Sequence, residues 1–138
     1  MLIGIIHSLI RKDEKLLVEA LERRRVPYEM IDIRDEIFDL HHGDRWKRFD
    51  VVLERCVGYH QALAAVEILE AWGVQCVNPS QVARTCGDKK TTTSELIKAG
   101  IPTPQVRIAF TPETAMQAIE EIGYPVVLKP VIGSWGRL

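Results

Sequence analysis

The first apolar run of the chain, Leu2–Ile6, constrains its fold more than any other feature. Successive side chains of a strand point to opposite faces, so a strand that is apolar at every position is buried on both faces. A parallel sheet with helices on both sides provides that environment for its central strands. The start of the chain therefore predicts an α/β fold.

Strand-like and helix-like patterns alternate after this run and are joined by short links. Apolar side chains at helical spacing predict helices over His60–Trp72 and over Asp13–Arg25, the latter capped by Asp13. Short β-type runs predict strands over Tyr28–Ile33, Asp50–Glu54 and Val74–Val77. This alternation predicts a Rossmann-like parallel sheet. No glycine-rich turn follows the first strand, which disfavours an enzyme that binds a nicotinamide or flavin dinucleotide.

A change of structural unit is expected around Cys86-Gly87, which divides the chain into domains over residues 1–86 and 87–138. The second domain is predicted to contain a helix, a strand, a helix and a strand, over Asp88–Ala99, Gln105–Ala109, Thr111–Gly123 and Val126–Lys129. Such a piece has an unpaired strand edge and little core. We therefore expect it to be the incomplete beginning of a longer domain.

Composition excludes several classes of function. The net charge is −1, so nothing favours nucleic acid or an anionic membrane as a partner. The three cysteines form no Cys-x-x-Cys pair, which argues against disulfides and zinc and fits a reducing cytoplasm. The first residues, Met-Leu-Ile-Gly-Ile-Ile, do not resemble a basic leader and no apolar run approaches membrane length, so we expect a cytoplasmic protein. The neighbours His41 and His42 have no third ligand at metal spacing and are interpreted as loop residues.

Two lysines are candidate phosphate ligands. Lys129 ends an apolar β-type run and is followed by a loop with glycines at positions 133 and 136. An ammonium and glycine backbone N–H groups together suit a polyphosphate. Lys89 begins a predicted helix, where a cation and free N–H groups converge on an anion, although a lysine there is more often solvated. The pairing of Lys89 with Lys129 favours the phosphate hypothesis.

The resemblance to a known family rests on four segments, Val74-Gln-Cys-Val-Asn-Pro79, Cys86-Gly-Asp-Lys89, Lys98-Ala-Gly-Ile-Pro-Thr-Pro104 and Gly123-Tyr-Pro-Val-Val-Leu-Lys-Pro130. Together they resemble the ATP-grasp superfamily. Two further segments are similar to its LysX and RimK-like ligases, namely Glu54-Arg-Cys-Val57 and Val131-Ile-Gly-Ser-Trp-Gly-Arg137. The resemblance covers nearly the whole chain and implies a pre-ATP-grasp domain followed by the start of an ATP-grasp domain.

The resemblance implies an ATP-dependent ligase that works through an acyl phosphate. In LysX the α-amino group of α-aminoadipate is joined to the C-terminal glutamate of the acidic carrier protein LysW, in lysine biosynthesis. Lys89 and Lys129 match the two ATP-contacting lysines of the family. The start of its phosphate-covering loop matches Gly133, Ser134, Trp135, Gly136, Arg137 and Leu138. For Arg137 a phosphate contact and a surface position are equal alternatives, and for Trp135 shielding of the loop competes with simple packing.

Alternatives remain open at this stage. Two alternatives are enzymes, namely the glutamate–LysW ligase of arginine biosynthesis and a RimK-type glutamate ligase. A third alternative is not an enzyme but a non-catalytic remnant or nucleotide-binding module. The Mg²⁺ ligands of the family are expected beyond Leu138, so we expect this chain alone not to catalyse ligation. From the resemblance we also expect the intact protein to be a homo-oligomer. Arg55 and His7 both follow strand ends, where ligands of α/β sheets bind. Arg55 is a weak candidate for holding a substrate carboxylate, whereas for His7 a structural or solvated role is favoured.

Overall fold

The computed structural model describes residues 1–133, and the chain divides into two compact units, Met1–Arg84 and Thr85–Leu138. We refer to them as the first and the second unit. The described part is built from parallel strands and helices, which confirms the predicted α/β class. No helix within it is long and apolar enough to cross a membrane.

The first unit is built on a four-stranded sheet with the order β2-β1-β3-β4. All neighbouring strands are parallel, and their bounds are Ile3–His7 (β1), Tyr28–Asp32 (β2), Val51–Arg55 (β3) and Cys76–Val77 (β4). The apolar run at the start of the chain supplies β1, every residue of which is buried. A central strand flanked by β2 and β3 is the environment that its uninterrupted apolar pattern requires.

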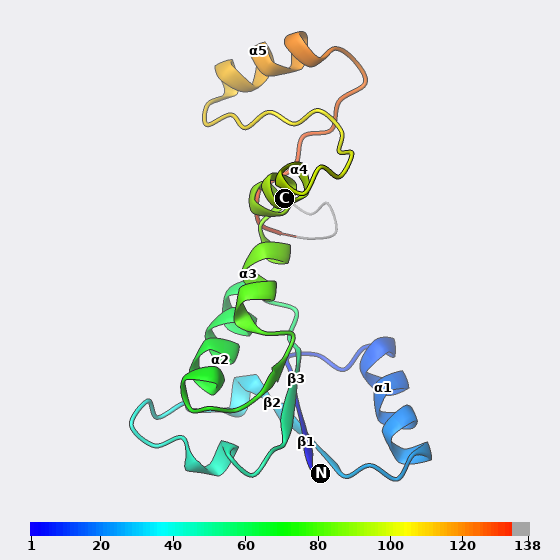
Figure 1. The fold of residues 1–138 in the computed structure, drawn as a ribbon, viewed down its shortest axis with the longest axis vertical. Helices are drawn as coiled ribbons and strands as arrows, with labels where there is room; N and C mark the ends of the chain where they lie inside the picture. The colour runs from blue at the N-terminus through cyan, green and yellow to red at the C-terminus, as the bar shows by residue number, and fades with distance from the viewer. Residues whose placement is uncertain (134–138) are drawn as a thin grey trace. The chain divides into compact units, whose positions relative to one another are not determined.

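Helices α1 (Lys12–Arg23) and α2 (Tyr59–Ala71) cover opposite faces of this sheet (Figure 1). Consecutive residues of β1 contribute to two separate cores, as a strand with two buried faces demands. Ile5 packs with Leu21 of α1, whereas Ile6 belongs to the larger cluster that contains Val66 and Leu69 of α2. Helical spacing therefore identifies the buried Leu21, Val66 and Leu69, but Leu16, which the same spacing counts on the apolar face of α1, is 50% exposed.

The start of α1 differs from the prediction. The residue at its N-cap is Arg11, and Asp13 lies inside the first turn, where a carboxylate still interacts favourably with the helix dipole. The Arg11 backbone N–H donates to the Glu14 carboxylate at 2.8 Å. Asp13 therefore does not cap the helix, because Glu14 receives the free N–H group at the helix start.

The segment between β2 and β3 contains two short 3₁₀ helices, Ile33–Asp35 and Asp44–Trp46. It buries an aromatic cluster under α2, since Trp46 is 1% exposed and stacks on Phe38 at 5.3 Å between ring centroids. This segment, polar in most positions, is therefore anchored to the larger core by one tryptophan.

Helix α3 (Ser80–Gly87) follows β4, and the second unit continues with α4 (Lys89–Lys98) and α5 (Pro112–Ile122). The side chains of Asp88 and Thr111 cap α4 and α5 by accepting hydrogen bonds from Thr91 N–H and Thr114 N–H.

The prediction of two strands in the second unit is wrong. Residues 105–109 and 126–129 form no strand, and the described part of this unit contains a single isolated bridge, Asp88–Ile132. A β-type sequence forms a strand only where another strand accepts its hydrogen bonds, and these two segments have no such neighbour among the described residues. Their apolar side chains are correspondingly exposed, for example Val127 at 76% and Leu128 at 74%.

Candidate functional site

The first candidate site lies where α4 begins. The Lys89 backbone N–H donates to the Val131 carbonyl at 3.0 Å, and Asp88 forms an antiparallel bridge with Ile132. These contacts join segments more than forty residues apart and hold Lys89 against the loop that Lys129 precedes. The Lys89 ammonium also donates to the Gly133 carbonyl, so its position is fixed at both ends.

The backbone at Gly133 has a φ of +119°, which L-residues with a side chain rarely adopt. Glycine is therefore required for the turn that presents its carbonyl to Lys89. Lys129 is exposed and makes no hydrogen bond or ion pair with the other described residues. Ser134, Trp135, Gly136, Arg137 and Leu138 lie outside the described residues.

The N-terminal turn of α4 differs from the sequence hypothesis in one respect. Two of its N–H groups are already occupied, because Lys89 N–H binds Val131 and Thr91 N–H binds the Asp88 carboxylate at 2.7 Å. The Thr91 N–H group accordingly lowers the pKa of Asp88. An anion at this site would therefore be bound mainly by the Lys89 ammonium, beside the Gly133 turn, rather than by these two helix N–H groups.

A second candidate site lies in the first unit, at the carboxyl edge of the sheet. Arg55 ends β3, and its guanidinium contacts Glu14 of α1, with Nε and Nη2 at 3.1 and 3.0 Å from Oε1. Arg11 binds the same carboxylate from the other direction, with Nε 3.1 Å from Oε2 and Nη2 2.9 Å from Oε1. One fully buried carboxylate therefore fixes two guanidinium groups.

The electrostatics of this edge follow from those contacts. Hydrogen bonds from Arg11 lower the pKa of Glu14 to about 2, against the opposing effect of burial. The same pairing raises the pKa of Arg11. A further carboxylate, that of Asp13, lies 3.9 Å from Arg55 Nη2 but is 70% exposed. Solvent screens that longer contact, so Glu14 is the dominant partner of both arginines.

Two more polar residues complete the edge. Ser8, which follows β1, accepts a hydrogen bond from Val57 N–H at 2.9 Å and so ties the loops after β1 and β3 together. His7, the last residue of β1, is 6% exposed, and its Nδ1 has no hydrogen-bond partner among the described residues. In the sheet register His7 lies between Asp32 of β2 and Arg55 of β3.

Sequence reasoning found Arg55 and His7 from their places at strand ends but missed Arg11, Ser8 and Glu14. A usable signal for Glu14 was present, because it precedes Leu17 and Leu21 at helical spacing and so lies on the buried face of α1. A carboxylate on such a face needs a cation partner.

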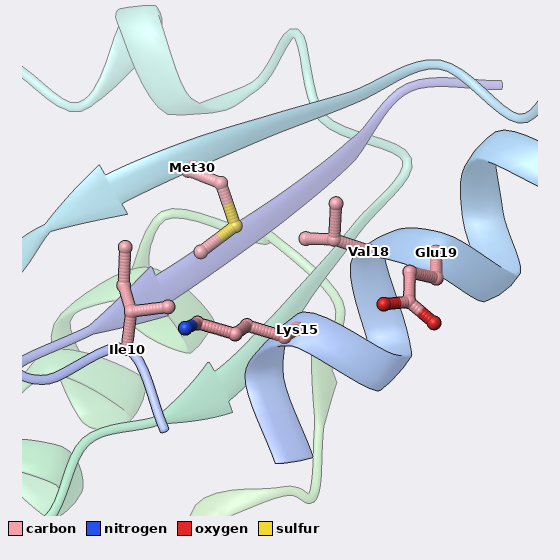
Figure 2. A pocket seen from close by; sticks show the side chains of 5 residues that line it. All are labelled: Ile10, Lys15, Val18, Glu19 and Met30. Carbon is pink, nitrogen blue, oxygen red and sulfur yellow. The ribbon is translucent and has the colours of Figure 1, made fainter. Parts of the chain in front are cut away.

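Two shallow pockets border α1. The first, about 350 Å³, is lined by Ile10, Lys15, Val18, Glu19 and Met30, and the Lys15 side chain extends toward Ile10 (Figure 2). The second, about 290 Å³, adjoins the arginine pair and is lined by Asp13, Leu17, Leu53, Glu54, Arg55, Val77 and Asn78. Of these two pockets, only the second is lined by Arg55, the candidate that the sequence analysis named.

The buried cysteines are neutral thiols, and no cluster in the described part of the chain has the composition of a metal site. Burial raises the pKa of both Cys56 and Cys76 to about 12, which keeps them as neutral thiols. Cys86 is exposed. No group of three or more His, Cys, Asp or Glu side chains among the described residues could hold a metal ion. Mg²⁺ is therefore not assigned to any residue.

Comparison with known proteins yields two family models. The LysX preATP-grasp domain matches residues 3–85, and the RimK-like ATP-grasp domain matches residues 86–138. Among solved structures, a RimK domain ATP-grasp protein from Sphaerobacter thermophilus superposes with a TM-score of 0.81 at 28% identity, over 100% of this chain and 52% of its own. The ADP complex of N5-carboxyaminoimidazole ribonucleotide synthetase shares the fold, with a TM-score of 0.70 at 22% identity, over 99% of this chain and 39% of its own.

Curated relatives point in the same direction. A protein named glutamate–LysW ligase ArgX, from Sulfurisphaera tokodaii, is 41% identical over the whole chain, which covers 48% of that relative. A protein from the same organism named α-aminoadipate–LysW ligase LysX is 33% identical, also over the whole chain and 49% of that relative. The chain thus spans about half the length of these relatives.

Proposed function

The chain belongs to the LysX preATP-grasp family, and on this premise we propose that it acts in an ATP-dependent carboxylate–amine ligase. The observation that carries the proposal is the fixed position of Lys89, whose backbone binds Val131 and whose ammonium binds Gly133. A lysine held against a glycine turn is suited to a phosphate group, which would replace the Gly133 carbonyl as its partner. Lys129, two residues before Val131, would supply a second charge.

The proposed reaction has two steps. A carboxylate oxygen of the acceptor attacks the γ-phosphorus of ATP, ADP leaves, and an acyl phosphate forms. The α-amino nitrogen of an amino acid then attacks the acyl carbon, inorganic phosphate leaves, and the nitrogen releases a proton. Lys89 and Lys129 would neutralise the charge that develops on the transferred phosphoryl group, which is the main task of a protein in phosphoryl transfer.

The acceptor in the proposal is the C-terminal glutamate of a LysW-type acidic carrier, and the amino acid is α-aminoadipate or glutamate. Glutamate is supported by the identity to the ArgX proteins, 41% and 38% over the whole chain, against 33%, 35% and 37% to the LysX proteins, the last over 64% of the chain. α-Aminoadipate is supported by the family model that matches residues 3–85, because that model is named after LysX. Mg²⁺ accompanies ATP in this proposal, with no ligand assigned among the described residues.

Calorimetric titration of this chain with Mg-ATP tests the phosphate site. Lys89→Ala and Lys129→Ala are each expected to weaken ATP binding by about tenfold or more, since hydrogen bonds to charged groups contribute about 1.5–3 kcal/mol. Lys98→Ala is the matched control, because Lys98 lies at the other end of α4 and pairs with Glu95. Equal affinities in all three variants would refute the assignment of the two lysines.

Ligase activity is tested separately, with the carrier, ATP and each amino acid in turn. ADP release that requires both the carrier and one amino acid would support the ligase proposal and identify the substrate. Because this chain alone is not expected to catalyse ligation, release is measured with the chain joined to the C-terminal half of the ArgX relative, and ATP binding without release there would restrict the proposal to nucleotide binding.

A further inference from the structure

We propose that Arg11 and Arg55 form a carboxylate clamp, held in place by Glu14, that binds a carboxylate of the amino-acid substrate. The inference rests on the proposed ligase function for the identity of the ligand. It assigns the amino-acid site to the first unit, whereas the lysines discussed above belong to the second. Its test is therefore independent of ATP binding.

The place of the clamp in the fold is the first argument. Ligands of open parallel sheets bind outside the carboxyl ends of the strands, where neighbouring strands lead to helices on opposite faces. In the order β2-β1-β3-β4 this point lies between β1, which is followed by α1, and β3, which is followed by α2. Arg11 comes from the loop after β1, Arg55 ends β3, and the bond from Val57 N–H to Ser8 holds the two loops together.

The free donors of the two arginines are the second argument. Glu14 occupies Nε and Nη2 of each guanidinium, and Nη1 of each has no acceptor among the described residues. Both side chains remain about one-third exposed, at 36% and 37%, so these groups can meet a ligand. Glu14 neutralises one of the two arginines, and the carboxylates of Glu54 and Asp13 also act on them, so the local charge has no positive excess. The case for a carboxylate ligand therefore rests on the free Nη1 groups and their exposure.

A third, independent argument comes from His7. A buried nitrogen without a hydrogen bond costs about 1–3 kcal/mol, so native proteins seldom leave one unpaired. His7 Nδ1 is such an atom, and its residue is the register neighbour of Arg55 at the same sheet edge. A carboxylate bound there would supply the missing partner if Nδ1 carries the proton.

The neighbouring pocket specifies the ligand further. Its walls combine the apolar side chains of Leu17, Leu53 and Val77 with Arg55 and the acceptors Asp13, Glu54 and Asn78. Apolar walls suit the methylene chain of an amino acid, and the carboxylates in the lining suit its ammonium group. Inorganic phosphate would share the contact with the arginines but would use neither the apolar walls nor the ammonium acceptor.

Titrations of this chain followed by NMR, with arginine Nε–H and histidine ring signals as reporters, test the clamp. Glutamate and α-aminoadipate are expected to shift the Arg11, Arg55 and His7 signals saturably, while butylamine, which has no carboxylate, leaves them in place. Arg55→Gln is expected to weaken amino-acid binding at least tenfold. Arg48→Gln, which alters a surface arginine paired with Glu29, is the control and should bind as the parent chain does.

Arg55→Lys keeps the charge but loses the fork of donors, and is expected to weaken binding severalfold in a chain whose thermal unfolding is unchanged. Amino-acid binding that Arg55→Gln leaves intact, or no saturable binding by the folded parent chain, would overturn the clamp. Inorganic phosphate that binds as tightly as glutamate would overturn its assignment to a carboxylate. ATP titrations of the same samples separate the two proposals. A parent chain that binds the amino acid but not ATP would contradict the proposed ligase function and leave the carboxylate clamp standing.

Discussion

Replacing Glu14 with glutamine tests how the first unit is held together. The substitution keeps the shape of a side chain that is 0% exposed but removes the charge that Arg11 and Arg55 share. Both guanidinium groups then lose a charged acceptor while a buried amide replaces it. We expect the Glu14→Gln chain to fold with the same secondary structure but with lower stability of the first unit.

The pKa of Glu14 gives the size of the loss. A decrease from 4.5 to about 2 favours the charged form in the folded state. At about 1.4 kcal/mol for each pKa unit, that decrease corresponds to roughly 3 kcal/mol. Removing one partner of a buried pair costs about 3–5 kcal/mol in other proteins. Because both arginines are partly exposed and thus screened, we expect a loss of about 2–3 kcal/mol at pH 7.

The sign of the pH dependence follows from the lowered pKa. The Glu14 contribution is fully present above its unfolded-state pKa, 4.5, and is lost as the pH falls toward its folded-state pKa, about 2. Stabilities of the parent and Glu14→Gln chains should therefore converge between pH 4.5 and about 2. Between pH 6 and 8 the difference should be constant.

Guanidinium chloride unfolding followed by tryptophan fluorescence measures this difference. A Trp135→Phe background confines the signal to Trp46 and Trp72, both in the first unit. Glu19→Gln, on an exposed position of the same helix, is the matched control and should change stability by less than about 0.5 kcal/mol. Equal stability of the Glu14→Gln and Glu19→Gln chains at pH 7 would refute the reasoning, and so would a difference that persists unchanged at pH 2.

Three further predictions concern packing and capping. Gly43→Ala should destabilise the first unit by about 1–3 kcal/mol, because the added methyl group would collide with the Trp72 ring; unfolding midpoints check this. Trp46→Ala should cost about 3–5 kcal/mol, whereas Leu40→Ala, at a position of the same unit that is 68% exposed, should cost almost nothing in the same denaturation assay, with Trp72 as the reporter. Thr111→Ala should lower helix stability by about 1 kcal/mol through loss of the α5 cap, seen as faster amide exchange in that helix alone.

The first unit was predictable because its signals are local. Runs such as Leu2–Ile6 are buried on both faces in any parallel sheet, and Gly73, with a φ of +80°, ends α2 where the sequence indicates. The strands over 105–109 and 126–129 were not predictable, because strand formation depends on a hydrogen-bonding neighbour rather than on composition. The same β-type residues therefore form a strand in one unit and none in the other.

The candidate sites show the same limit. Arg55 could be found because it ends a strand, and Lys89 because Asp88 precedes it as a helix cap. Their partners could not, because the Arg55–Glu14 pair spans 41 residues and the Lys89–Gly133 pair spans 44. Spacing along the chain predicts neighbours within one helix or strand, whereas these contacts depend on how different segments pack.

Stability alone does not account for the Glu14 cluster. A buried ion pair is costly to desolvate, and well-packed apolar residues of similar volume often replace one without loss. The apolar face of α1 could have continued through position 14 toward Leu17 and Leu21. A carboxylate there does what leucine cannot, since it holds Arg11 and Arg55 together with one N–H-bearing nitrogen of each left free. If the cluster served packing only, Glu14→Leu with both arginines changed to methionine would be as stable as the parent chain and would still bind glutamate. We expect that triple variant to fold and to lose amino-acid binding.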